Sequence, residues 1–332
     1  MSTGPSTRTL TYHEAIREAL WQALEADPAV FLLGEDIATY GGVYKVTAGF
    51  LERFGAERVI DTPIAENAII GAATGAALVG MRPVAEIQFA DFMACGLDPL
   101  VNMTSTIHYR WGQPVPLVVR APAGATWASA GPFHSQSPEA WFAQIPGLKV
   151  VMPATPADAK GLLTAAIRDP NPVIVLEQKY LYRRLSGPVP EGEHVVPIGQ
   201  AAIARAGRDA TLVAWGSMAF KGLEAARMLA ASDGIDLEVV DLRSIVPWDR
   251  AAVLASVART GRAVVVYEAH RTAGFGAEVA ATIAEEAFGD LDAPVMRLAG
   301  LDTPIPAHPV LEAAYLPDEH AIAAAVRRLV AY

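Results

Sequence analysis

The chain has 332 residues, of which 52% are hydrophobic and 19% are charged, and its formal net charge is −10. This length exceeds what one ordinary hydrophobic core covers, so we expect two domains. The negative charge argues against nucleic acid or an anionic membrane surface as the main partner. The single cysteine, Cys95, excludes an internal disulfide framework and is typical of a reducing compartment.

No targeting or membrane-spanning segment is predicted. The N-terminal stretch lacks the apolar core of a secretory signal, and the longest apolar run covers residues 68–81. That run is shorter than the roughly 20 residues that span a bilayer. We therefore expect a cytoplasmic protein without a membrane partner.

The first half of the chain predicts alternating strands and helices. Thr11 and Glu14 form a capping-box pattern before an amphipathic helix that ends near Asp27. Strands are then expected at residues 30–33, 58–61, 82–87, 116–120, 149–152 and 173–177, and helices at 48–54, 62–80, from about 92 to 109, and 156–168. This alternation indicates a mostly parallel, helix-covered sheet.

The most informative local pattern is DTPIAENAIIGAATGAALVG, residues 61–80. Thr62 is expected to cap the helix and Pro63 to occupy its first position, which places Glu66 in the first turn. Glu66 is the only charged residue between Asp61 and Arg82. It could simply complement the helix dipole. Alternatively, it is a desolvated carboxyl of raised pKa that shares a proton with a basic nitrogen.

A boundary is predicted at residues 185–197, which hold three prolines and two glycines with little periodicity. Beyond it, strands are expected at residues 211–214, 237–240, 263–267 and 295–298, and helices at 219–231, 249–260, 275–288 and 319–330. The predicted organisation is a first domain at 1–185, a linker at 186–198 and a second domain at 199–332. Both domains are expected to be α/β, each with a mostly parallel sheet.

Several catalytic patterns are weak or absent. Gly274 and Gly276 follow a strand as in a dinucleotide loop, but Val279 stands where the third glycine is needed. These glycines are better explained by a helix that starts close to the sheet. No Gly-x-Ser-x-Gly elbow supports a hydrolase, and the seven histidines and Cys95 have no metal-ligand spacing.

A long small-residue loop, residues 121–138, contains the run His134-Ser135-Gln136-Ser137. Such loops within compact domains are more often binding loops than filler. His134 is therefore either a solvated loop histidine or a functional residue, and the pattern does not decide between them. Phe89 and Phe92 follow a strand and could be ordinary core residues or a platform for a flat heterocycle.

Motifs that occur in order along nearly the whole chain suggest a family. They are GED from Gly34, GGV from Gly41, DTPIAE ending at Glu66, RPVAEIQF from Arg82, HSQSPEAWF from His134, PGLKVV from Pro146, DAKGLL from Asp158, DPNPV from Asp169 and VDLR from Val240. With these motifs, the chain resembles the β subunit of the thiamine-diphosphate-dependent, decarboxylating component of 2-oxo acid dehydrogenase complexes. This group includes the pyruvate, branched-chain 2-oxo acid and acetoin dehydrogenases.

The resemblance implies a transketolase-like pyrimidine-binding domain followed by a transketolase C-terminal-like domain. It also implies a set of site residues. Glu66 matches the glutamate that bonds the aminopyrimidine ring of the cofactor and shares a proton with it. Phe92 matches the aromatic residue that stacks on this ring, and Gln88 lies close to it in the pattern. His134 matches the histidine assigned to proton transfer around the reaction intermediate and the incoming lipoyl group.

The resemblance further implies a structural potassium ion, held largely by backbone carbonyls. The matching positions are Leu117, Ala166, Ile167, Asp169 and Asn171. Thiamine-diphosphate enzymes bind the diphosphate through Mg²⁺ with a Gly-Asp-Gly motif, which this sequence lacks. An α subunit is therefore expected to hold Mg²⁺ and the rest of the cofactor, in an α₂β₂ heterotetramer with the cofactor at the α/β interface.

The implied reaction is oxidative decarboxylation of a 2-oxo acid, with acyl transfer to a lipoyl domain of the acyltransferase core. Two departures flank the implied substrate entrance: Tyr109-Arg110-Trp111-Gly112 replaces the usual Gly-Gly pair, and the loop at 121–134 is one residue longer, with Trp127 inside it. They leave the substrate open among pyruvate, branched 2-oxo acids and acetoin. A transketolase-type carboligase subunit and a non-catalytic interaction subunit remain alternatives, although the presence of Glu66 and His134 argues against the second.

Overall fold

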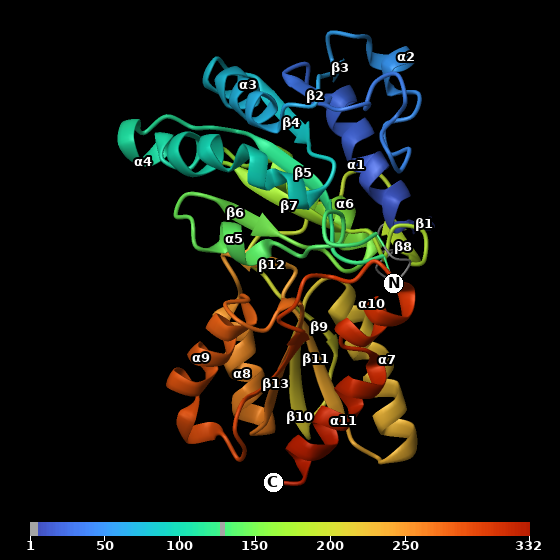
Figure 1. Cartoon of the computed structure of the whole chain (residues 1–332), viewed down its shortest axis with the longest axis vertical. Coiled ribbons are helices and arrows are strands. Elements are labelled where there is room, and N and C mark those ends of the chain that lie inside the picture. Colours follow the sequence, from blue (N-terminus) through green and yellow to red (C-terminus); the bar gives the residue numbers. More distant parts are fainter. Residues whose placement is uncertain (1–5, 127–129) are drawn as a thin grey trace. The chain divides into compact units, whose positions relative to one another are not determined.

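The computed structural model describes residues 6–126 and 130–332. Its contacts divide the chain into two compact units, one of residues 1–123 and 141–198 and one of residues 124–140 and 199–332. Each unit contains a predominantly parallel sheet flanked by helices (Figure 1). The predicted α/β class with two sheets is therefore confirmed. Among the described residues, no helix combines the length and apolar character needed to cross a membrane.

The sheet of the first unit is parallel, in the order β6-β7-β5-β4-β2-β3. Its strands are β2 (Val30–Gly34), β3 (Val59–Asp61), β4 (Arg82–Glu86), β5 (Val118–Ala123), β6 (Lys149–Val151) and β7 (Val173–Gln178). Strands β2, β5 and β7 are buried along their whole length. Helices cover both faces of such a sheet, so its strands have apolar runs rather than alternating patterns.

Helix α1 (Tyr12–Ala26) packs against α6 (Pro156–Arg168). The predicted capping box is present, because the Thr11 side chain accepts from the Glu14 backbone while the Glu14 side chain accepts from the Thr11 backbone. Thr155 caps α6 in a similar way through the backbone N–H of Asp158. The bounds of α6 are those that the sequence predicts.

Helix α3 (Glu66–Leu78) begins later than predicted. Its N-cap is Ala65, which makes no side-chain capping bond, so the assignment of Thr62 as the cap is wrong. The Thr62 N–H instead donates to the Gly34 carbonyl oxygen at 3.0 Å, which continues the ladder between β2 and β3. A residue before proline is also biased toward extended backbone. Glu66 consequently occupies the first position of the helix.

The helix predicted from about residue 92 to 109 is also wrong, because the segment is broken into three pieces. They are the 3₁₀ helix η1 (Ala90–Gly96), the π-helical turn η2 (Pro99–Thr104) and α4 (Ile107–Trp111). Residues 97 and 98 between η1 and η2 remain helical, so the type of helical hydrogen bonding changes along the segment. Pro99, the first residue of η2, has no N–H to donate. Short helices α2 (Phe50–Phe54) and α5 (Glu139–Ala143) complete the helical elements of this half.

Part of the predicted linker is structured. Strand β8 (Ser186–Pro190) pairs antiparallel with β1 (Thr7–Thr11). Edge strands tolerate proline because one row of backbone groups needs no partner. The buried Lys160 ammonium then bonds the carbonyl oxygens of Pro190 at 2.9 Å and Gly192 at 2.5 Å, and the Glu18 carboxylate at 2.6 Å. These contacts fix residues 190–192 to the first unit.

The second unit has a sheet in the order β14-β13-β10-β11-β9, in which only the β9–β11 pairing is antiparallel. Its strands are β9 (Ala202–Arg205), β10 (Ala210–Ala214), β11 (Leu237–Asp241), β13 (Ala263–His270) and β14 (Met296–Gly300). Two pairs of helices flank these strands, one pair on each side (Figure 1). One pair is α7 (Ser217–Ser232) with α11 (Glu319–Val330), and the other is α8 (Arg250–Thr260) with α9 (Gly276–Glu286). Shorter elements are β12 (Ser244–Val246), η3 (Phe288–Asp290) and α10 (Pro309–Tyr315).

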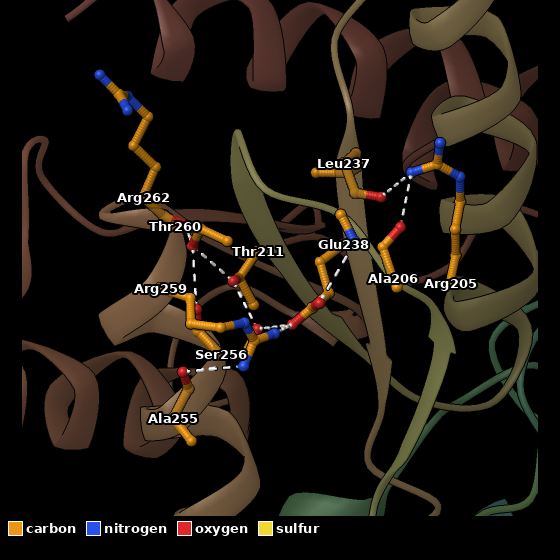
Figure 2. Close-up of polar contacts among 11 residues, drawn as sticks. Arg205, Ala206, Thr211, Leu237, Glu238, Ala255, Ser256, Arg259, Thr260 and Arg262 are labelled. Atoms are coloured by element: carbon orange, nitrogen blue, oxygen red, sulfur yellow. Dashed lines mark hydrogen bonds and ion pairs between the residues drawn. The ribbon is translucent and has the colours of Figure 1, made fainter.

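A buried polar cluster joins α8 to this sheet. Figure 2 shows the carboxylate of Glu238 with Ser256 and Arg259 as donors. The Thr211 hydroxyl bonds those of Ser256 and Thr260, each at 2.7 Å. Because every hydroxyl has a partner, the cluster satisfies its polar groups away from water and has a structural role.

Candidate active site

Neighbouring parallel strands of the first unit end at one edge of its sheet. Gly34 of β2 pairs with Asp61 of β3 and with Glu86 of β4, and Glu86 pairs with Arg120 of β5. Residues that directly follow these strand ends are therefore brought together. In open α/β sheets, ligands bind outside the carboxyl ends of the strands, which makes this edge the candidate site.

Glu66 lies at this edge as the first residue of α3, and it is only 8% exposed. Its backbone is approached closely by Gly96 at the end of η1. A β-carbon on Gly96 would lie 3.2 Å from the Glu66 carbonyl oxygen and 2.3 Å from the Ile70 side chain. Glycine at this position thus allows η1 to pack onto the first turn of α3.

Glu35 is a second buried acid at this edge and follows directly on β2. It is 7% exposed, and its Oε1 has no hydrogen-bond partner among the described residues. Burial raises the pKa of Glu35, and the negative charges of Glu66, Asp36 and Glu86 raise it further. Two buried acids, Glu35 and Glu66, therefore lie close enough to interact.

Gln88 joins this pair. Its side-chain Nε2 donates to the Glu35 carbonyl oxygen at 2.5 Å. The structure thus brings the predicted residues Glu66 and Gln88 together with Glu35, which sequence reasoning did not single out as a site residue. The available signal was the acidic Glu35-Asp36 pair directly after a fully buried strand.

Phe92 lies in η1, half-buried, and its N–H donates to the Phe89 carbonyl oxygen at 2.9 Å. The Phe89 ring packs edge-on against Tyr44, with ring centroids 6.2 Å apart. The Lys179 ammonium lies 4.8 Å from the Phe89 ring centroid. Phe89 and Phe92 are both half-buried in this stretch.

An ionic cluster lies beneath this edge. The Arg120 guanidinium donates to both Glu177 oxygens, at 2.7 and 2.6 Å, and also to Glu86. The Tyr182 hydroxyl donates to Glu177 as well. All four side chains are buried. Burial raises the pKa of Glu86, and the adjacent Arg120 opposes this rise. The cluster ties together the carboxyl ends of β4, β5 and β7.

His134 belongs to the second unit, and the structure leaves it half-buried. Its N–H donates to the Gly131 carbonyl oxygen at 3.2 Å, so the histidine follows a tight turn. Gly131 has φ of +77°, a left-handed conformation that suits glycine. Trp127, which sequence reasoning placed near the substrate entrance, lies outside the described residues.

The five positions expected to hold potassium all lie in the first unit. Arg82 donates to the Ile167 carbonyl oxygen at 2.9 Å, and Lys149 contacts the Asp169 carboxylate at 2.5 Å. The buried Asn171 Oδ1 has no hydrogen-bond partner within residues 6–126 and 130–332. Within the same residues, no three His, Cys, Asp or Glu side chains are placed to hold a metal ion.

Comparison with known proteins places the chain in a class. The family described as "Transketolase, pyrimidine binding domain" matches residues 8–184, and that described as "Transketolase, C-terminal domain" matches residues 199–322. A solved structure titled "Split gene transketolase, inactive beta4 tetramer" superposes with a TM-score of 0.77 at 27% identity, covering 97% of this chain and 99% of that one. The fold and its carboxyl-edge acids thus define a transketolase-type chain.

Curated relatives narrow the class. The β subunit of 2-oxoisovalerate dehydrogenase from Bacillus subtilis is 45% identical, over 97% of this chain and 99% of its own length. The β subunit of the pyruvate dehydrogenase E1 component from Rhizobium meliloti is 45% identical, over 98% and 70%. The β subunit of acetoin:2,6-dichlorophenolindophenol oxidoreductase from Cupriavidus necator is 44% identical, over 97% of each chain. The chain belongs to the family of 2-oxo acid dehydrogenase E1 β subunits.

Thiamine diphosphate is the cofactor of this family. The residues at the sheet edge fit the pyrimidine end of this cofactor on two counts. Glu35 has a buried oxygen without a described partner, and the carboxyls of Glu35 and Glu66 interact in a site with little exposure. Such acids can hold a proton at a heterocyclic nitrogen. Phe92 lies in η1, which follows β4 at this edge of the sheet, and its half-buried ring offers an apolar face.

Proposed function

We propose that this chain is the catalytic β subunit of a 2-oxo acid dehydrogenase. Together with an α subunit, it would catalyse thiamine-diphosphate-dependent oxidative decarboxylation of a 2-oxo acid and transfer of the acyl group to a lipoyl domain. The observation that supports this most is the pair of interacting buried acids, Glu35 and Glu66, at the carboxyl edge of the first sheet.

Glu66 is assigned the role of holding a proton at the pyrimidine nitrogen. When bound, thiamine diphosphate supplies a carbon nucleophile and accepts the electrons released by decarboxylation. Burial keeps water away from the Glu66 carboxyl, so a proton shared with the ring is not lost to solvent. Phe92 would stack on the ring, and Gln88, fixed by its bond to the Glu35 carbonyl, would line its edge. Glu35, whose pKa is raised by burial and by the charge of Glu66, would lie beside the Glu66 carboxyl.

His134 is assigned proton transfer during acyl transfer to the lipoyl group. An imidazole suits this role because its ordinary pKa lies near neutral pH. The second unit holds its segment, and the half-buried ring is compatible with access by a substrate.

The partners follow from the groups that this sequence lacks. Without a Gly-Asp-Gly motif, the chain needs an α subunit to hold Mg²⁺ and the diphosphate. We propose an α₂β₂ heterotetramer that docks to a lipoyl-bearing acyltransferase core in the cytoplasm, with neither nucleic acid nor membrane as a partner. We further assign pyrimidine binding to residues 1–185, a linker to 186–198 and the transketolase C-terminal-like domain to 199–332.

A structural potassium ion is proposed at Leu117, Ala166, Ile167, Asp169 and Asn171. The buried Asn171 Oδ1 without a described partner supports it. Arg82 contacts the Ile167 carbonyl oxygen, which the ion would share, whereas Lys149 contacts the side-chain carboxylate of Asp169. Replacing K⁺ by Na⁺ at equal ionic strength should lower the melting temperature of the chain. An unchanged melting temperature over a K⁺ titration would rule the site out.

Reconstitution tests the main proposal. The chain alone should show no decarboxylase activity, and adding the α subunit with Mg²⁺ and thiamine diphosphate should restore it. Turnover by the purified chain alone would contradict the shared cofactor. Comparing pyruvate, branched 2-oxo acids and acetoin with the reconstituted pair identifies the substrate.

The role of Glu66 needs variants in the assembled enzyme. Glu66→Ala should abolish activity while leaving assembly with the α subunit intact. Asn67→Ala is a matched control, because Asn67 is exposed in the same first turn. Near-normal turnover by Glu66→Ala would reject the assigned role.

A further inference from the structure

The segment that contains His134 is attached to the second unit at both ends by buried carboxylates. At its start, the Ala125 N–H donates to Glu268 Oε1 at 2.5 Å. Near its end, Glu139 Oε1 accepts from the Trp215 indole Nε1 at 3.1 Å. Glu139 is fully buried and Glu268 is 4% exposed. The two ends of residues 124–140 are thus held by Glu139 and Glu268.

The turn at residues 215–217 donates hydrogen bonds to both carboxylates. Trp215 donates to Glu139, and two residues later the Ser217 hydroxyl donates to Glu268 Oε2 at 2.7 Å. Gly216 between them has φ of +54° and forms the N-cap of α7. The Trp215 ring is stacked on Tyr267 of β13, with centroids 5.6 Å apart and an interplanar angle of 13°. The Trp215 and Ser217 donors are therefore fixed to the sheet. Their hydrogen bonds to Glu139 and Glu268 fix the ends of residues 124–140 to it as well.

Contacts within residues 124–140 also restrict the position of His134 itself. The Gly124 N–H donates to the Gln136 carbonyl oxygen at 2.8 Å, which joins the two limbs just past the histidine. A β-carbon on Gly131 would lie 3.2 Å from the Ala307 β-carbon, so the turn before His134 also packs against the second unit. Ala125 lies in a small core with Ile305, Tyr315 and Leu316.

The arrangement is electrostatically unfavourable. Burial raises the pKa of Glu139 to about 7, and the charge of Glu268 adds to the rise, while Ser137 and the Trp215 indole oppose it. The ionisable groups that face it are Glu268, Tyr267 and Tyr315. Apolar side chains of similar volume would avoid this desolvation. Unlike apolar contacts, the hydrogen bonds of Glu139 and Glu268 are directional. Each carboxylate therefore holds one end of the segment in one geometry.

We propose that Glu139 and Glu268 are positioning residues, which together fix the place of His134 by clasping both ends of its segment onto the turn at residues 215–217. The inference rests on the proposed function, which assigns proton transfer to His134. Neither carboxylate is assigned a contact with the substrate. Their effect passes through the described backbone contacts on either side of His134.

The test uses the reconstituted α/β enzyme with a lipoyl domain as acceptor. Trp215→Phe removes the indole donor but keeps a large aromatic ring, and Glu139→Ala removes the acceptor. Each should lower kcat for lipoyl acylation by about 10- to 100-fold, the scale expected for a misplaced catalytic group, with little change in KM or in thiamine diphosphate affinity. Glu139→Gln keeps an oxygen that can accept from the indole, so its kcat should stay within about threefold of the parent.

A double-mutant cycle separates this inference from its premise. If the hydrogen bonds of Glu139 and Glu268 act through His134, adding Trp215→Phe to His134→Ala should cause no further loss of kcat. Glu286→Gln, which changes an exposed carboxylate of α9 in the same unit, is the matched control and should be silent.

The outcomes are distinguishable. If His134→Ala retains full lipoyl acylation, the proposed role of His134 fails. If His134→Ala is inactive but Trp215→Phe and Glu139→Ala match the parent, only the positioning role of Glu139 and Glu268 is refuted. Equal losses in Glu139→Ala and Glu139→Gln, or additive losses in the cycle, would also overturn it. Where Glu139→Ala does not fold, Trp215→Phe with Glu139→Gln decides the matter.

Discussion

Replacing Arg120 by methionine should destabilise the first unit strongly. Methionine fills a similar volume but removes the guanidinium that neutralises Glu86 and Glu177. Glu177 is fully buried and Glu86 is 6% exposed, so water cannot take over these interactions. The variant would hold two uncompensated carboxylates in the core, at the carboxyl ends of β4 and β7.

The magnitude follows from removing one partner of a buried ionic cluster. Such changes cost about 3–5 kcal/mol. The loss should be smaller at acid pH, because burial raises the pKa of Glu86 and its protonation then removes buried negative charge. The Tyr182 hydroxyl still donates to Glu177 and prevents a complete loss of its hydrogen bonds. We therefore expect the upper part of the range at pH 8 and a clear reduction near pH 5.

Urea unfolding of the purified chain, followed by circular dichroism and tryptophan fluorescence, measures this change. Arg168→Met is the matched control, since Arg168 forms an exposed ion pair with Glu193. The control should shift the unfolding free energy by less than about 1 kcal/mol. A loss below 1 kcal/mol for Arg120→Met, or a loss that does not depend on pH, would refute the reasoning.

Three further predictions concern stability. Gly34→Ala should cost about 1–3 kcal/mol in urea unfolding, because the added β-carbon would lie 2.6 Å from the Glu86 carbonyl oxygen; a neutral result would contradict this packing. Lys160→Met should cost about 1–3 kcal/mol by the same assay and should increase proteolysis after residue 190, since it releases Pro190 and Gly192; unchanged proteolysis would argue against that anchor. Glu139 keeps a proton in the folded state up to about pH 7, above its ordinary pKa, so stability should fall by up to about 3 kcal/mol as pH rises from 4.5 to 7. Glu139→Gln should flatten this pH dependence, and a parallel pH profile in the variant would count against it.

Periodicity and capping patterns predicted much of the local structure. The capping box at Thr11 and Glu14, the bounds of α6 and α11, and the alternation of strands with helices are confirmed. These features depend on neighbours three or four residues apart, which a single sequence displays.

The predicted start of α3 and the single helix after Phe92 failed for a different reason. Thr62 bonds Gly34, which is distant in sequence, and the segment from Ala90 to Trp111 is divided into 3₁₀, π and α turns. Tertiary hydrogen bonds and packing override local propensity in both places.

In the candidate active site, too, some residues were predicted from local motifs and others were found only from tertiary contacts. Glu66, Gln88, Phe92 and His134 were assigned from motifs, and their roles stay predictions. Glu35 gained importance only when the strand register placed it beside Glu66 and its Oε1 proved to be buried without a described partner. Burial and charge proximity are properties of the packed chain, so no sequence window displays them.

By itself, the sequence determined the α/β class, the two sheets and the family, because short-range periodicity and ordered motifs are written along the chain. Only the tertiary structure decided which acids share the edge of the first sheet and that residues 124–140 belong to the second unit. The physical reason is that these outcomes depend on buried hydrogen bonds between residues far apart in sequence. The bond of Ala125 to Glu268 spans 143 positions, and no local pattern records it.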